Sequence, residues 1–295
     1  MNNRRRRGKS MKSVRLVEAA QRILAEIHPA SVRAVCYRLF IDGFIASMDK
    51  ANTNRVSAQL TWAREQGVLP WDWIVDETRA PERTSTWTDA ESIMASCLRN
   101  YRRDNWREQP YWVELWSEKG TVRGTLSPIL DDYGITFRVM HGHGSATAVY
   151  AAADETKGSP KPLTILYVGD HDPSGMHMSQ IDLPRRLARY GGNTEIIRVA
   201  IAAMDTASSA GVPSFAAKTA DPRHAWYVEH FGGRCWELDA LNPVVLRNRV
   251  KEQVLCRLDL AAWQHGLMIE TAERDSMTGF FARWPSISGH AKEFP

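Results

Sequence analysis

The spacing of hydrophobic and polar positions predicts helices near the start of the chain. Residues 14–27 and 32–40 repeat apolar positions every three to four residues and predict two helices, the second with Ser31 as its N-cap. Residues 53–67 predict a third helix after a turn that contains Gly43. Residues 68–79 resemble a short hairpin instead. Three short helices followed by a β-wing form the winged helix-turn-helix, which usually binds duplex DNA. We therefore predict a winged-helix domain at residues 14–79.

The spacing of hydrophobic positions changes from helical to strand-like in the second part of the chain. Residues 80–110 are polar, with prolines near both ends, and predict a connector that contains one helix. Strand-like runs then alternate with helical stretches, which predicts parallel βαβ units in an open sheet of the α/β class. We expect a Rossmann-like domain at residues 111–295, with a helical extension at its C-terminal end. The four predicted strands are residues 111–116, 135–140, 163–168 and 194–201.

Carboxylates follow two of these predicted strands. Glu118 comes directly after the first strand, and Asp170 and Asp172 come after the third, in "GDHDPSG". Chemistry in open parallel sheets gathers at the carboxyl ends of the strands, where three carboxylates would raise one another's pKa values unless a cation compensates them. A few hard oxygen ligands favour Mg²⁺, with Mn²⁺ as a substitute. The alternative is structural: Asp170 caps the following helix and Asp172 shapes a turn.

Other motifs have weaker support. The "GKS" at residues 8–10 lacks the first glycine and the preceding strand of a P-loop. The "HGHGSAT" at residues 141–147 lacks both the Asp-His that would favour a histidine zinc site and the third glycine of a dinucleotide loop, so we interpret it as a glycine turn that can approach a phosphate. The four cysteines form no CxxC pair, which argues against a zinc cluster, and we expect them to be buried thiols.

Positive charge is concentrated at the N-terminal end. The formal net charge is +4, and six of the 38 Lys and Arg residues, including Arg4, Arg5, Arg6 and Arg7, lie in the first 12 residues without an acidic neighbour. We expect a disordered basic arm at residues 1–13. It either contacts nucleic-acid phosphates or serves as a solubilising tail. Because no membrane-spanning stretch or signal-peptide core is found, we expect a cytoplasmic, DNA-associated protein with no membrane partner.

Several motifs occur in the order found in one known family. The Glu118-Lys119 pair in "ELWSEKG" and the "GDHDPSG" segment resemble the Toprim domain of the topoisomerase VI A subunit and of the meiotic double-strand-break transesterase. The segment "SVRAVCYRLF" is similar to that family's nucleophile segment, in which an arginine precedes the catalytic tyrosine by four residues. "AAKTADPR" and "CWELDAL" resemble segments of stand-alone A-like proteins, so the similarity spans about residues 14–265. Cys36 stands where members commonly have a first tyrosine, which leaves Tyr37.

The resemblance implies a mechanism and partners. Tyr37 would attack duplex DNA and form a phosphotyrosyl link at a 5′ end, with Arg33 stabilising the developing charge. Glu118, Asp170 and Asp172 would hold Mg²⁺, and Lys119 would contact a phosphate. The enzyme would be a homodimer in which each tyrosine serves the partner's carboxylates. Strand passage would need a separate ATPase (B-type) subunit, because the chain carries no ATPase signature.

Two other functions stay open on the sequence alone. One is a Toprim hydrolase, in which a water activated by the metal attacks the DNA and Tyr37 takes no part. The other is a winged-helix DNA-binding protein without catalytic activity, in which the carboxylates are structural.

Overall fold

The computed structural model describes residues 10–75, 84–140, 146–207 and 211–283. The chain divides into two compact units. The first unit combines residues 1–80 with 113–254, and the second combines residues 81–112 with 255–295. The predicted connector therefore does more than link two domains, because it pairs with the C-terminal helical extension in a unit of its own.

The three helices predicted near the N-terminal end are present in the first unit. They are α1 (Met11–Ile27), α2 (Val32–Ile41) and α3 (Lys50–Glu65). Each begins at a residue whose side chain accepts a hydrogen bond from the backbone three positions later, namely Ser10, Ser31 and Asp49. Their apolar faces pack into one hydrophobic cluster, which explains why the helical period was readable in the sequence.

The described part of the predicted β-wing is not a hairpin. Residues Trp71–Trp73 form a single 3₁₀ turn, η1, and the next residue, Ile74, makes only an isolated parallel bridge with Ala30. Pro70 precedes the turn and has no N–H for a strand ladder, while the guanidinium of Arg64 stacks on the ring of Trp71 at 4.7 Å. The rest of the predicted hairpin, residues 76–79, lies outside the described residues.

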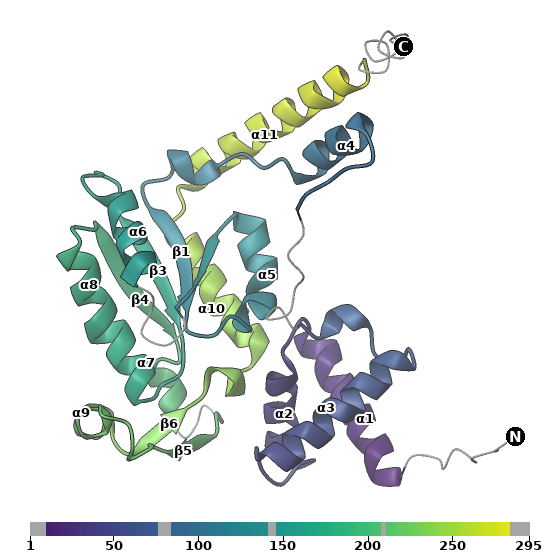
Figure 1. The fold of residues 1–295 in the computed structure, drawn as a ribbon, viewed down its shortest axis with the longest axis vertical. Coiled ribbons are helices and arrows are strands. Elements are labelled where there is room, and N and C mark those ends of the chain that lie inside the picture. Colours follow the sequence, from purple (N-terminus) through teal and green to yellow (C-terminus); the bar gives the residue numbers. More distant parts are fainter. Residues whose placement is uncertain (1–9, 76–83, 141–145, 208–210, 284–295) are drawn as a thin grey trace, which may run out of the picture. The chain divides into compact units, whose positions relative to one another are not determined.

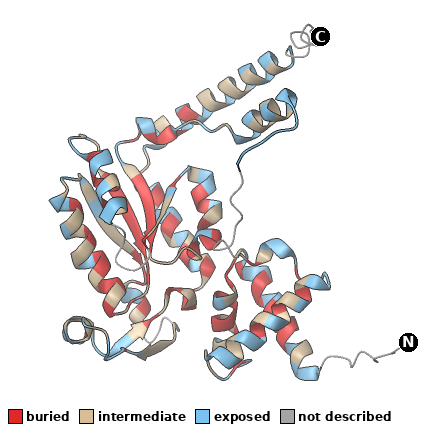
Figure 2. Cartoon of the chain, viewed as in Figure 1, coloured by how far each residue is buried: buried red, intermediate tan, exposed pale blue. Residues whose placement is uncertain are grey.

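A four-stranded sheet forms the centre of the first unit, and all four strands were predicted. The order is β2-β1-β3-β4, and the pairs β1/β2 and β3/β4 are parallel. Every residue of β3 is buried, as expected for a central parallel strand. Figure 2 shows this burial along the middle of the sheet. The strands are β1 (Trp112–Ser117), β2 (Thr136–Val139), β3 (Leu163–Val168) and β4 (Thr194–Ala200).

Helices cover both faces of this sheet, which makes the first unit an α/β fold. In Figure 1, α6 and α8 lie on one face, and α5 and α10 lie on the other. The helices are α5 (Val122–Tyr133), α6 (Ala146–Thr156), α7 (Pro173–His177), the π-helical turn η4 (Met178–Asp182), α8 (Leu183–Arg189) and α10 (Pro243–Leu255).

A small two-stranded antiparallel sheet was not predicted from the sequence. It pairs β5 (Ser214–Ala216) with β6 (Arg234–Trp236), and α9 (His224–Phe231) lies between them in the chain. Two further 3₁₀ turns, η5 (Ala203–Thr206) and η7 (Leu238–Ala240), precede and follow this β5/β6 sheet in the chain. The strands have three residues each, too few for an alternating pattern to be recognised.

The second unit is helical. It contains α4 (Ala90–Asn100), the 3₁₀ turn η3 (Asn105–Glu108) and α11 (Leu260–Phe281). Glu273 accepts hydrogen bonds from the Tyr101 hydroxyl and from Arg103 Nη1 at 2.5 and 2.8 Å. No helix in the described part of the chain has the length and hydropathy needed to cross a membrane.

Candidate active site

Arg33 and Tyr37 lie together on α2, as their spacing of four residues predicted. The guanidinium carbon of Arg33 is 5.6 Å from the centroid of the Tyr37 ring. Tyr37 is not part of the hydrophobic cluster of α1, α2 and α3, yet its side chain has no exposed surface. Its ring meets Phe215 of β5 edge to face, with centroids 6.3 Å apart. The β5/β6 sheet, which was not predicted, therefore covers the tyrosine.

The Tyr37 hydroxyl is buried without a hydrogen bond. Among the described residues it has no partner of normal geometry. Burial raises the pKa of the phenol above its ordinary value, the negative charge of Glu237 raises it further, and Arg33 opposes both effects. The phenol is therefore neutral near pH 7, and a reaction at this oxygen would require a group that removes its proton.

Arg33 binds two carboxylates that follow β6. Its Nε and Nη2 both donate to Glu237 Oε2, the Nε bond being 3.0 Å long, and Nε lies 3.6 Å from Asp239 Oδ2. Asp239 also accepts a hydrogen bond from the Ser31 hydroxyl at 3.2 Å. These contacts attach the start of α2 to η7.

Asp170 and Asp172 follow β3 and have different partners. Asp170 Oδ1 accepts hydrogen bonds from Lys119 Nζ at 2.8 Å and from the Leu238 amide at 2.7 Å. Asp172 is the N-cap of α7, and its Oδ1 accepts a bond from the Gly175 amide at 2.7 Å. The capping alternative therefore holds for Asp172, whereas the sequence reading had assigned the cap to Asp170.

Glu118 follows β1 and couples electrostatically to both aspartates. Burial raises the pKa of its carboxyl, and the negative charges of Asp172 and Asp170 raise it further, while Lys119 opposes them. Burial also raises the pKa of Asp170, again against Lys119. The predicted convergence of three carboxylates on one sheet edge is thus visible as mutual repulsion, which one lysine only partly compensates.

The oxygen donors at this edge are of the type that Mg²⁺ prefers. In the described ranges no group of three or more His, Cys, Asp or Glu side chains is gathered closely enough to hold a metal ion. Mg²⁺ nevertheless keeps several waters and commonly binds through one or two carboxylates plus substrate phosphates. The partly uncompensated charge of Glu118, Asp170 and Asp172 is an electrostatic environment that a divalent cation would stabilise.

Lys119 bridges two carboxylates rather than pointing to an open phosphate position. Its Nζ lies 2.8 Å from Asp170 Oδ1 and 3.1 Å from Asp239 Oδ2. Burial acts to lower the pKa of Lys119, but Asp239 and Asp170 together raise it above the usual range, so the amine stays charged. Contacts therefore run within one chain from the Tyr37 ring through Arg33, Asp239 and Lys119 to Asp170. We call these five residues the ionic relay.

No family model, curated protein or solved structure matches the chain.

Arg198 supports the loop that carries the aspartates. It lies in β4, and burial lowers the pKa of its guanidinium. Among the described residues, its Nε, Nη1 and Nη2 donate to neutral oxygens on both sides of the loop, which fixes the backbone around "GDHD". The acceptors are the carbonyls of Gly169, Asp170, Gly175 and Ile201 and the hydroxyl of Ser179. Sequence reasoning missed this residue, although an arginine inside the apolar run "TEIIRVAI" was a visible signal.

His171 lies between the two aspartates in sequence but is buried among aromatic rings. Its Nδ1 is 2.8 Å from the Tyr227 hydroxyl, and its ring packs edge to face against Phe231 and Trp236. Burial, assisted by the positive charge of Arg198, lowers the pKa of His171 to about 4. The imidazole is therefore neutral near pH 7 and anchors the loop to α9 and β6.

Glu237 and Asp239 were not predicted as site residues. The segment that contains them, "CWELDAL", was singled out only by resemblance, and no periodicity places it beside α2. Arg4, Arg5, Arg6 and Arg7 lie outside the described residues, as does the glycine turn at 141–145. All four cysteines are free, and Cys97 and Cys256 are exposed, which corrects the expectation that all are buried.

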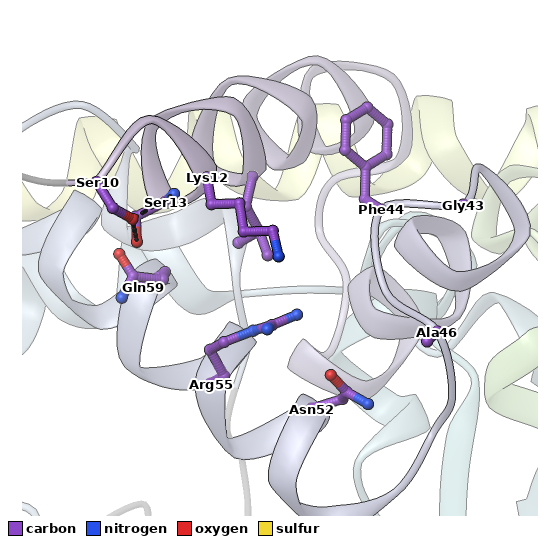
Figure 3. A pocket seen from close by; sticks show the side chains of 10 residues that line it. Ser10, Lys12, Ser13, Gly43, Phe44, Ala46, Asn52, Arg55 and Gln59 are labelled. Atoms are coloured by element: carbon purple, nitrogen blue, oxygen red, sulfur yellow. Dashed lines mark hydrogen bonds between the residues drawn. The ribbon is translucent and has the colours of Figure 1, made fainter.

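A basic pocket lies where α1 begins. Its volume is about 470 Å³, and it is bounded by the start of α1, the turn at residues 43–46 and α3. Figure 3 shows Lys12 and Arg55 pointing toward the same space from the two helices. The N-terminal end of α1 adds the partial positive charge of its free amides. The pocket directly follows the basic arm in sequence, so its charge extends that of the arm.

Proposed function

We propose that this protein is a metal-dependent DNA-cleaving transesterase of the topoisomerase VI A-subunit kind, built from a winged-helix domain and a Toprim domain, with Tyr37 as its nucleophile. The observation that carries the proposal is the ionic relay. It joins a buried tyrosine on the second helix to the carboxylate edge of a parallel sheet, and the two features were predicted separately from distant parts of the sequence.

The reaction assigns a role to each group. The Tyr37 oxygen attacks a DNA phosphodiester, a phosphotyrosyl bond forms, and the deoxyribose 3′ oxygen leaves. Arg33, already against the phenol ring, stabilises negative charge that develops on the phenol or the phosphate. Glu118, Asp170 and Asp172 would hold Mg²⁺, or Mn²⁺ in its place, which when bound supplies charge stabilisation at the scissile phosphate.

The arrangement described here is a closed state. Tyr37 has no exposed surface, so a phosphodiester can reach it only after the β5/β6 sheet with Phe215 moves away. Phosphates that pair with Arg33 and Lys119 would compete with Glu237, Asp239 and Asp170 for the same cations. DNA would thereby open the relay and expose the phenol in the same event.

Duplex DNA is the proposed substrate, and the N-terminal basic groups are proposed to bind its backbone. The pocket with Lys12 and Arg55 includes residues that directly follow Arg4 to Arg7 in the sequence. We also propose a homodimer, an optional ATPase (B-type) subunit for strand passage, and a location on cytoplasmic DNA. Because the relay connects Tyr37 to Asp170 within one chain, we propose that each active site is formed in cis.

A metal-dependent hydrolase is the second candidate, and one observation favours it. Tyr37 is fully buried, whereas the side chains of Asp170 and Lys119 keep 15% and 26% of their surface exposed. Small reactants such as a metal ion and water could therefore reach the carboxylates without any rearrangement around the tyrosine.

Denaturing electrophoresis separates the candidates. The protein is incubated with end-labelled supercoiled and linear duplex DNA and Mg²⁺ or Mn²⁺, and then treated with detergent. We expect label to migrate with the protein in wild type and to be lost in Tyr37→Phe, while Tyr133→Phe, a variant of another tyrosine in the first unit, behaves as wild type. Cut DNA without attached protein in both wild type and Tyr37→Phe would establish the hydrolase. Unchanged DNA that is still bound by the protein would leave only a binding function.

A further inference from the structure

The Tyr37 phenol has to lose a proton before its oxygen can attack a phosphodiester. Its ordinary pKa near 10 leaves about 0.1% of a free phenol ionised at pH 7, and burial makes ionisation less favourable still. Among the described residues the hydroxyl has no hydrogen-bond partner of normal geometry, so no structural contact holds its proton. An acceptor for its proton has to come from what surrounds it.

Glu237 is placed to be that acceptor by Arg33. One guanidinium contacts both groups: it lies over the Tyr37 ring at 5.6 Å, and its Nε donates to Glu237 Oε2 at 3.0 Å. Both bonds from Arg33 go to the same carboxylate oxygen, Oε2. Glu237 also acts directly on the phenol, because its negative charge raises the pKa of Tyr37.

We propose that Glu237 is the general base that deprotonates Tyr37 during DNA cleavage, an inference that rests on the proposed transesterase function. The Tyr37 O–H bond breaks and its proton passes to the Glu237 carboxylate. The Tyr37 oxygen bonds to phosphorus, the bond from phosphorus to the 3′ oxygen breaks, and the 3′ oxygen takes a proton from water. Glu237 then returns its proton to solvent. Arg33 keeps the carboxylate beside the phenol and remains as the positive charge next to the new phosphotyrosyl group.

The test compares rates of covalent adduct formation in four proteins with the same DNA and Mn²⁺. We expect Glu237→Gln to slow the reaction by about 10²- to 10⁴-fold, the usual contribution of general acid-base catalysis. Glu229→Gln, which removes an exposed carboxylate of α9 outside the ionic relay, should match wild type. Glu237→Asp keeps a carboxylate beside Arg33 but shortens its side chain by one methylene. We expect adduct formation in this variant to be at least tenfold slower than in wild type. Equal DNA affinity in all four proteins establishes that they are folded.

A second substrate distinguishes a base from an acid. DNA with sulfur in place of the bridging 3′ oxygen has a leaving group that needs no protonation. A variant that is slow because the tyrosine is not deprotonated stays slow on this substrate. A variant that is slow because the leaving group is not protonated recovers the wild-type rate. We expect Glu237→Gln to stay slow on this substrate. The inference is overturned if sulfur restores Glu237→Gln to the wild-type rate, or if Glu237→Gln or Glu237→Asp matches wild type on ordinary DNA. Absence of adduct in wild type would overturn the proposed function, and the inference with it.

Discussion

The ammonium group of Lys119 lies 2.8 Å from the carboxylate of Asp170, at the edge where β1 and β3 end. The lysine follows one strand and the aspartate follows its neighbour in the sheet, so the contact exists only because β1 and β3 are adjacent. Lys119 compensates part of the negative charge that Glu118, Asp170 and Asp172 place at this edge. Its positive charge therefore supplies part of the charge compensation that a bound divalent cation would provide.

Replacing this lysine should change stability and metal affinity in opposite directions. Lys119→Met leaves Asp170 and Asp239 without their shared cation, and we expect the free energy of unfolding to fall by about 2 kcal/mol, less than for a fully buried pair because the groups retain some solvent contact. The affinity for Mg²⁺ or Mn²⁺ should rise several-fold, because a competing positive charge is gone. Calorimetric titration and urea unfolding measure the two effects.

The matched control is Lys157→Met, which removes an exposed lysine of the same unit and should alter neither quantity. Divalent-ion affinity that falls in Lys119→Met would show that the lysine helps to form the cation site instead of competing with it.

Removing the Tyr37 hydroxyl should not weaken the fold. The hydroxyl is buried and has no hydrogen-bond partner of normal geometry in the described part of the chain. Tyr37→Phe therefore keeps the ring contact with Phe215 and removes a polar group that is desolvated without compensation. We expect the free energy of unfolding to stay equal or to rise by up to about 1 kcal/mol. Chemical denaturation measures it, and a loss of more than 1 kcal/mol would mean that the hydroxyl has a bonded partner.

Two substitutions at Asp172 separate its capping role from its charge. Asparagine caps helices about as well as aspartate, so Asp172→Asn should keep the bond to the Gly175 amide while removing one negative charge from the edge. We expect near-unchanged stability but weaker Mg²⁺ binding. Asp172→Ala should lose both properties, with a fall of about 1 kcal/mol in unfolding free energy. Equal Mg²⁺ affinity in wild type and Asp172→Asn, measured by calorimetry, would remove Asp172 from the cation site.

His171 should make the protein less stable as the pH falls. Its pKa is lowered from an ordinary 6.5 to about 4 in the folded state, so the unfolded chain binds a proton more readily between these values. The full stabilisation is present above pH 6.5 and is lost progressively as the pH falls toward 4. A shift of this size corresponds to about 3 kcal/mol in unfolding free energy.

His171→Phe tests this pH dependence. Phenylalanine suits the aromatic surroundings, and the Tyr227 hydroxyl can still donate to the backbone carbonyl of residue 171 or of Arg234. We expect the variant to lose that part of the decline in stability between pH 6.5 and 4, as followed by thermal unfolding. His265→Phe, at an exposed position of α11, should retain the whole decline. An identical decline in both variants would assign it to other groups.

The basic pocket should contribute to the salt dependence of DNA binding. If Lys12 and Arg55 each neutralise a phosphate, the slope of log affinity against log salt concentration falls by about 2 in Lys12→Ser/Arg55→Gln, and by several units more when residues 2–9 are deleted. Arg185→Gln/Lys251→Ser removes two exposed cations elsewhere and should keep the slope. Filter binding at several salt concentrations measures it. A slope common to all variants would mean that the arm and pocket do not touch DNA.

The sequence by itself predicts what depends on local periodicity. α1, α2 and α3 are readable because one face of each is buried in a single cluster, and β1 to β4 because short β-rich runs alternate with helices. The pairing of Arg33 with Tyr37 follows from helix geometry alone. The gathering of Glu118, Asp170 and Asp172 at one edge follows from the rule that parallel strands point the same way.

Tertiary structure decided what depends on contacts between distant segments. Nothing in the local pattern places Glu237 and Asp239 beside Arg33, because more than 200 residues separate them and only the packing of η7 on α2 brings them together. The same holds for the burial of Tyr37 under Phe215. Phe215 belongs to the β5/β6 sheet, whose strands are too short to show an alternating hydrophobic pattern. Lys119 looked like a free phosphate ligand until the fold supplied two carboxylates for it. Electrostatic partners are chosen by proximity in space, and only the folded chain defines that proximity.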